Sequence, residues 1–129
     1  MMKLLISVRS VGEARLVAAG GADFIDLKEP RDGALGGLPV DTIAAIARAL
    51  RADASPLPIS ATIGDLGMGE IERIAAAVRA VAACGVDYVK VGIEAAPGAA
   101  EVLAMLARCD AVVVPVFIAD RGIDPALLR

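Results

Sequence analysis

Three charged residues stand inside stretches of this chain that otherwise look like buried strands. Asp26 and Lys28 belong to the apolar run 24–28, and Lys90 belongs to the run 87–91. A strand of a parallel sheet is covered on both faces and is nearly all apolar, so charges inside it need a reason. Lysine is also scarce, with 3 lysines against 10 arginines. We therefore interpret Asp26, Lys28 and Lys90 as a candidate catalytic cluster.

The cluster suits chemistry on a carbonyl group. Asp26 and Lys28 are two residues apart, so their side chains point to the same side of a strand. Two ammonium groups that are close together and partly dehydrated each favour loss of the other's proton. A neutral lysine can form a Schiff base with an aldehyde or ketone, a second lysine can move protons, and a carboxylate can orient one ammonium. The cluster predicts carbanion or enamine chemistry without a cofactor or a metal. The alternative is a structural Lys–Asp pair at the rim of the sheet.

Weaker candidates lie at the ends of the other predicted strands. Small polar or acidic side chains there could contact a substrate, although polar packing and helix capping are equally open explanations. We assign substrate binding to four of them: Ser7, Thr62, Asp65 and Asp120. Ser60 shares a side of its strand with Thr62. The glycine-rich stretch 29–38 and its Arg31 could hold a phosphate or form a plain solvated loop, because the stretch matches neither common phosphate-binding motif.

Short β-branched runs alternate with helical patterns along the whole chain. The predicted strands are 4–8, 24–28, 59–63, 87–91 and 111–118, and the predicted helices are 12–19, 39–50, 70–84 and 96–108, with a fifth helix beginning at 122–129. This alternation predicts βαβ units and a parallel sheet, hence an α/β fold. Two architectures fit, namely an open doubly wound sheet and part of a (β/α)8 barrel.

An internal repeat bears on this choice. Residues 19–25 (AGGADFI) are similar to residues 83–89 (ACGVDYV), at an offset of 64 residues that spans two βα units. Such spacing favours a barrel that grew by duplication, although any helix that ends at glycine before a strand can look alike. The repeat aligns Asp26 with Lys90 and predicts similar heights on their strands. In a barrel, both would face the mouth where active sites occur.

Composition excludes several classes of function. The 129 residues carry a formal net charge of −3 and no histidine. We therefore expect no nucleic-acid partner, no His-based catalytic pair and few options for zinc. Cys84 and Cys109 are isolated, which predicts no disulfide framework and a reducing, cytoplasmic location. No apolar run approaches the ~18 residues of a spanning helix, so we expect no membrane partner.

Four strings of the sequence resemble one enzyme family. They are LLISVRSVGEA, AGGADFIDLKEPRDGALG, ISATIGD and GVDYVKVG, and the resemblance that they carry extends in order over nearly all 129 residues. They resemble the (5-formylfuran-3-yl)methyl phosphate synthase family of methanofuran biosynthesis. The resemblance implies a TIM barrel that condenses two molecules of glyceraldehyde 3-phosphate as a lyase. It also implies that Lys28 forms the Schiff base, that Lys90 is the proton acceptor and that Asp26 is a carboxylate of the same site.

The resemblance also predicts what this chain lacks. Family members are much longer, and their later half carries a strand-end motif of the form LDTA-x-K that is absent here. We therefore expect residues 1–129 to be a single domain, the N-terminal portion of a (β/α)8 barrel with about five strands and four to five helices. Such a sheet has unpaired edges, so we expect a homo-oligomer or pairing with a separate C-terminal half. The alternatives are another Schiff-base aldolase or isomerase, or a non-catalytic flavodoxin-like domain with an order-switched sheet.

Overall fold

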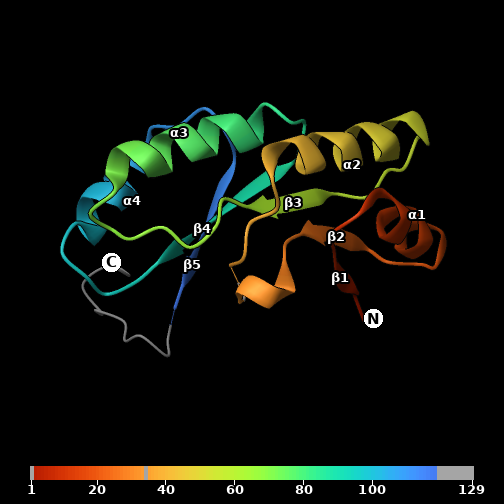
Figure 1. The fold of residues 1–129 in the computed structure, drawn as a ribbon, viewed down its shortest axis with the longest axis horizontal. Helices are drawn as coiled ribbons and strands as arrows, with labels where there is room; N and C mark the ends of the chain where they lie inside the picture. The colour runs from red at the N-terminus through yellow and green to blue at the C-terminus, as the bar shows by residue number, and fades with distance from the viewer. Residues whose placement is uncertain (1, 34, 119–129) are drawn as a thin grey trace.

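Five short strands pair side by side in the computed structural model, which describes residues 2–33 and 35–118 (Figure 1). The strands are β1 (Leu5–Val8), β2 (Phe24–Leu27), β3 (Ile59–Thr62), β4 (Tyr88–Ile93) and β5 (Val113–Phe117). Within the described residues the α-helices are α1 (Val11–Ala19), α2 (Val40–Ala52), α3 (Ile71–Ala82) and α4 (Ala99–Ala107), and a short 3-10 helix spans Pro30–Asp32. The predicted α/β fold is confirmed. The helix expected at 122–129 lies outside the described residues.

The sheet is parallel and its strands follow the chain order β1-β2-β3-β4-β5. A doubly wound sheet needs a reversal of strand order, so the order-switched flavodoxin-like alternative is wrong for the part of the chain that the structure describes. Right-handed crossovers that all advance in one direction place their helices on one side of a sheet. Successive helices contact one another in the same order, and Figure 1 shows α2 and α3 lying along that side.

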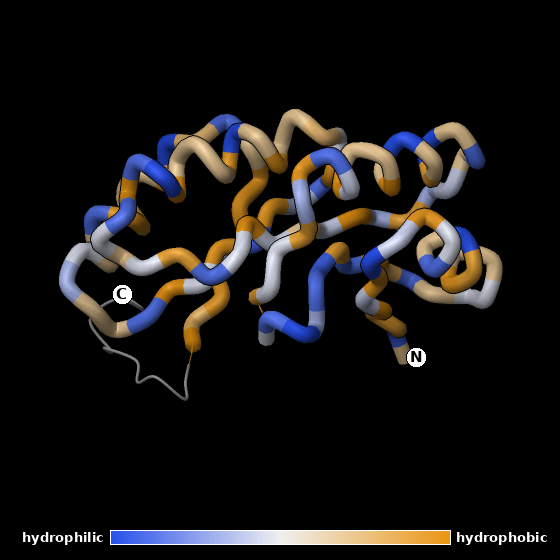
Figure 2. Tube along the Cα trace, in the orientation of Figure 1, coloured by the Kyte–Doolittle hydropathy of each residue, from blue (hydrophilic) through white to orange (hydrophobic). Residues whose placement is uncertain are grey.

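The core lies between the sheet and the helices. Ile25, Leu27 and Ile59 from the strands are fully buried there, and they meet the apolar stripes of the helices. On α2 the stripe is Ile43, Ile46, Ala47 and Leu50, which follow the i, i+3, i+4, i+7 spacing of one helix face. Figure 2 shows apolar residues along the strands and polar residues on the outer sides of the helices. None of the helices in residues 2–33 and 35–118 is long and apolar enough to cross a bilayer.

The opposite side of the sheet is mixed in character. Alternation along the strands puts Leu5, Phe24, Tyr88 and Val114 on this side, where they are 58%, 37%, 38% and 40% exposed. Asp26 and Lys90 have the same parity on β2 and β4 and share this side. We call it the polar face. It is the side on which the predicted chemistry would take place.

The repeat in the sequence is a repeat in local structure. Asp23 accepts a hydrogen bond from the amide of Leu4 at 2.8 Å, and Asp87 accepts one from the amide of Ile59 at 2.8 Å. Each aspartate thereby ties the start of its own strand to the start of the preceding strand. The glycine two residues before each aspartate has a positive φ, +95° and +92°, which favours glycine at both places.

Candidate active site

Asp26, Lys90 and Ser60 form a contact network on the polar face. Asp26 lies in the middle of the sheet and its side chain is only 2% exposed. Its Oδ2 is 3.1 Å from Nζ of Lys90, and its Oδ1 accepts a hydrogen bond of 2.7 Å from Oγ of Ser60. Both carboxylate oxygens therefore have a partner, one from β4 and one from β3. A buried carboxylate needs such compensation, because burying an unpaired charge is strongly unfavourable.

The strand register shows how these residues meet. Asp26 is registered with Ser60, and Ser60 with Tyr88, whereas Lys90 is registered with Thr62. Lys90 therefore lies two residues beyond the position level with Asp26, and its long side chain reaches back to the carboxylate. The repeat had predicted similar heights; in hydrogen-bond register the two positions are offset by two residues across two strand steps.

Lys28 directly follows β2. By the strand register it lies in the same row as Lys90, where a row is the set of residues level with one another on neighbouring strands. Its amide donates to the carbonyl of Val8 at 3.2 Å, so the extended backbone continues through it. Since Leu27 is registered with Ala61, Lys28 is level with Thr62, and Thr62 is level with Lys90. Their strands are two apart, which puts the two lysine backbones about 10 Å from each other. Lys28 is half-buried, and within the described part of the chain its ammonium has no carboxylate partner.

The predicted substrate-binding residues have different surroundings. Ser7 is exposed on β1 and registered with Asp26. Thr62 is 1% exposed, and its hydroxyl donates to the carbonyl of Leu35 at 3.2 Å. Asp65 is exposed in the loop after β3. Asp120 lies outside the described residues. Substrate contact by these four residues stays a prediction.

The loop after Lys28 folds back over the polar face, which the sequence did not reveal. Leu35 is 8% exposed and lies against Gly92, where an added Cβ would be 2.2 Å from Cδ1 of Leu35. Gly92 is two residues after Lys90, so this apolar side chain covers the next row of the sheet. A glycine inside a strand often marks a close approach by another segment, but the predicted strand 87–91 ended before Gly92, so this signal could not be read from the sequence.

Two arginines lie near this loop at the surface. Arg9 and Arg31 are 3.7 Å and 3.9 Å from Oε1 of Glu29. The side chain of Arg31 is 79% exposed, so this pair is weak and screened by solvent. The solvated interpretation of Arg31 fits this geometry better than a built phosphate site.

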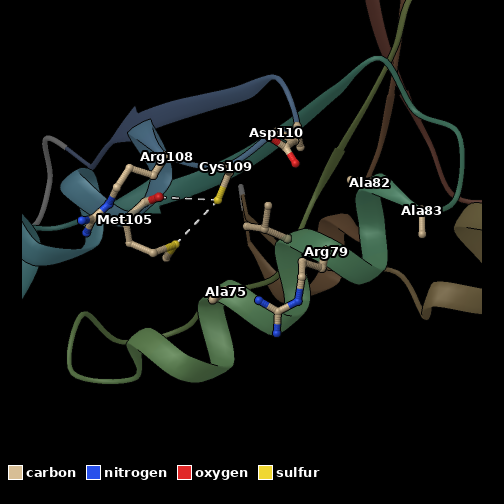
Figure 3. A pocket seen from close by; sticks show the side chains of 10 residues that line it. Ala75, Arg79, Ala82, Ala83, Met105, Arg108, Cys109 and Asp110 are labelled. Atoms are coloured by element: carbon tan, nitrogen blue, oxygen red, sulfur yellow. Dashed lines mark hydrogen bonds between the residues drawn. The ribbon is translucent and has the colours of Figure 1, made fainter.

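A separate groove of about 630 Å³ opens between α3 and α4 (Figure 3). It is lined by alanines together with Arg79, Met105, Arg108 and Cys109, and Sγ of Cys109 lies 3.7 Å from the sulfur of Met105. This groove lies among the helices, on the side of the sheet away from the two lysines. We do not count it as part of the candidate active site.

Known proteins of one family are similar to this chain over most of its length. The family model of 4-HFC-P synthase matches residues 4–126. The (5-formylfuran-3-yl)methyl phosphate synthase of Methanocaldococcus jannaschii is 44% identical over 92 residues, which cover 71% of this chain and 37% of that protein. The synthase of the same name from Methanosarcina barkeri is 40% identical over 96 residues, covering 71% of this chain and 38% of that protein.

A protein of Methylorubrum extorquens, whose name assigns it provisionally to the same synthase, is 43% identical over 98 residues, or 76% of this chain and 39% of that protein. The chain thus spans about two fifths of the length of the curated relatives it matches. The family match over residues 4–126 and the identity to these relatives both indicate the same family. The chain belongs to the 4-HFC-P synthase family, the (5-formylfuran-3-yl)methyl phosphate synthases that its motifs resemble.

Proposed function

We propose that this chain carries the Schiff-base half of a (5-formylfuran-3-yl)methyl phosphate synthase. In this proposal it is a cytoplasmic, cofactor-independent lyase that joins two molecules of glyceraldehyde 3-phosphate for methanofuran biosynthesis. The observation that carries the proposal is the buried Asp26–Lys90 ion pair with Lys28 in the same row of the polar face. Family membership supports the same reaction.

The two lysines divide the chemistry between them. The neutral amine of Lys28 adds to the aldehyde carbon, and the resulting carbinolamine loses water to give an iminium. The Lys90 ammonium supplies the proton that leaves in this water. The iminium then acidifies the neighbouring carbon. The neutral Lys90 amine removes a proton from that carbon and becomes an ammonium again. The enamine so formed is the nucleophile toward the second aldehyde. Asp26 keeps Lys90 in place during both transfers.

Strand stagger supports a barrel as the setting of this chemistry. The repeat positions Asp26 and Lys90 are offset by two residues across two strand steps, which is one residue per strand. A barrel of eight strands with a shear of 8 distributes its stagger at this rate. The strands also follow one another in chain order without a reversal, as they do in such a barrel. We propose that the sheet is part of a (β/α)8 barrel.

Borohydride trapping tests the role of Lys28. The chain is incubated with glyceraldehyde 3-phosphate and sodium borohydride, alone and with the C-terminal part of a relative, and its peptides are analysed by mass. We expect a reduced adduct on Lys28, no adduct in Lys28→Ala, and slower turnover in Lys90→Ala. Lys3 is the third lysine of the chain and is an internal control for non-specific reaction.

The outcomes separate the alternatives. A reduced adduct on Lys3 and Lys28 alike, or on neither, would contradict the role of Lys28. An adduct with other aldehydes but not with triose phosphate would indicate another Schiff-base aldolase. In both cases the mass of the labelled peptide identifies the residue without an assay of the complete reaction.

A further inference from the structure

The ion pair between Asp26 and Lys90 passes over a strand that lies between them. Asp26 is on β2 and Lys90 is on β4, so the pair bridges β3. Strands two apart are separated by about 10 Å, which is much more than the 3.1 Å between the two charged groups. Both side chains must therefore lean across β3. The residue of β3 level with Asp26 is Ser60.

Ser60 favours an ion pair across β3 in two ways. Its side chain is small, which leaves room for the two longer side chains above β3. Its hydroxyl also donates to Oδ1 of Asp26 at 2.7 Å, a length typical of an O–H group bonded to a carboxylate. Rotation of a carboxylate about its last torsion is otherwise broad. With Ser60 on one oxygen and Lys90 on the other, the plane of the Asp26 carboxylate is set from both sides.

We propose that Ser60 is a positioning residue: its hydroxyl orients the Asp26 carboxylate so that the second oxygen holds the Lys90 ammonium. Ser60 acts through Asp26 and does not need to touch the substrate. The catalytic meaning of this arrangement rests on the proposed function, because Lys90 is there the proton-transfer group. The orientation itself is a property of the protein without substrate and can be measured separately.

The same row of the sheet provides a matched comparison. Ser7 is registered with Asp26 from the other side, on β1, but within the described residues the hydroxyl that reaches Asp26 comes from Ser60. Ser7→Ala and Ser60→Ala therefore remove the same group from the two neighbours of one carboxylate. Only the second removal should affect Lys90.

The test is the rate of reductive methylation of each lysine by formaldehyde and cyanoborohydride, without substrate, read by peptide mass analysis. In Ser60→Ala we expect Lys90 to be methylated roughly three- to tenfold faster, because one charge-assisted hydrogen bond no longer orients its partner. Lys3 and Lys28 should keep their wild-type rates. Ser60→Thr retains the hydroxyl and should restore slow labelling of Lys90, and Ser7→Ala should leave it unchanged.

Several results would overturn the proposal. They are an unchanged Lys90 rate in Ser60→Ala, an equal rise in Ser7→Ala, or a rise at all three lysines, which would indicate general loosening. If Ser60→Ala does not fold, Ser60→Cys keeps the size with a weaker donor, and wild-type labelling of Lys90 in that variant would equally contradict the role of the hydroxyl. Failure of the proposed function would instead show as a missing Lys28 adduct in the wild-type chain, whatever happens to Lys90.

Discussion

Gly36, in the loop after Lys28, is the position where a single methyl group should disturb this protein most clearly. An added Cβ there would be 2.1 Å from the carbonyl oxygen of Glu29 and 2.7 Å from Cβ of Asp32. The first of these atoms is backbone, so no side-chain rotation can relieve the overlap. The amide of Glu29 also donates to the carbonyl of Gly36 at 2.9 Å, which closes the loop at this place.

The expected loss of stability follows from these contacts. Overpacking against a backbone atom costs about 1–3 kcal/mol. If the loop opens to admit the methyl group, the Glu29–Gly36 hydrogen bond is lengthened or lost, which adds roughly 0.5–1.5 kcal/mol. We therefore expect Gly36→Ala to lower the free energy of unfolding by roughly 1.5–4.5 kcal/mol. Because the loop directly follows Lys28, the variant should also form less trapped adduct.

Gly12 provides the control, since the same substitution there should act in the opposite direction. It is exposed within α1, and an added Cβ meets nothing within 4 Å. Alanine is favoured over glycine by about 1 kcal/mol in a helix interior. Gly12 lies in the first turn of α1, so Gly12→Ala should stabilise the protein by a part of this amount. Urea unfolding followed by circular dichroism measures both variants. If Gly36→Ala is as stable as Gly12→Ala, the close approach of Gly36 to Glu29 is not a feature of the folded protein and the reasoning fails.

Three further predictions concern the ion pairs and the edges of the sheet. Asp26→Ala should lower the free energy of unfolding, measured by urea titration, by roughly 2–4 kcal/mol, because it leaves the half-buried charge of Lys90 uncompensated. Adding Lys90→Met removes that charge and should recover part of the lost stability. A double variant less stable than Asp26→Ala would contradict this. Desolvation alone would raise the pKa of Asp87, but hydrogen bonds from Arg51 and a backbone amide, with the charge of Arg51, outweigh it and lower that pKa. The stabilisation is therefore present above the ordinary pKa of an aspartate and is lost as pH falls through the lowered value, so the stability difference between wild type and Asp87→Asn should shrink below about pH 4, and a constant difference would refute it. Sedimentation velocity at micromolar concentration should show species larger than a monomer, because β1 and β5 are the edge strands of the described sheet and unpaired edges favour association; a wild-type monomer would contradict pairing at these edges.

Local patterns in the sequence were sufficient to predict the helices and strands that the structure describes. Apolar spacing of three and four residues predicted one buried helix face formed by Val40, Ile43, Ile46, Ala47 and Leu50. The structure buries the last four, whereas Val40 at the start of α2 is 43% exposed. Short β-branched runs predicted all five strands that the structure describes, with differences of a few residues at their ends. The end of the fourth strand was predicted at residue 91, but β4 continues to Ile93. It continues because Gly92 and Ile93 still pair with β5, which no local pattern shows.

The contacts of the site could be predicted only in part. Strand parity put Asp26 and Lys28 on one face and the repeat aligned Asp26 with Lys90, but the register between strands decided which atoms meet. Ser60 was noted only as a residue that shares a side with Thr62. Its bond to Asp26 depends on the pairing of β2 with β3, which is set by loop lengths and packing that the sequence does not display. The same holds for Leu35, whose loop crosses to Gly92 from another part of the chain.

The surroundings of the two lysines bear on their roles independently of any relative. Asp26 has its two oxygens bound to Ser60 and Lys90 and compensates the charge of the second. Within the described residues, Lys28 has no carboxylate of this kind beside it, although it lies in the same row. A Schiff base requires the neutral amine, whereas a proton carrier must hold a proton before it can return one. These surroundings favour the proposed assignment of Lys28 as the Schiff-base lysine and of Lys90 as the proton carrier. This is the same division of roles that the resemblance of the motifs implied.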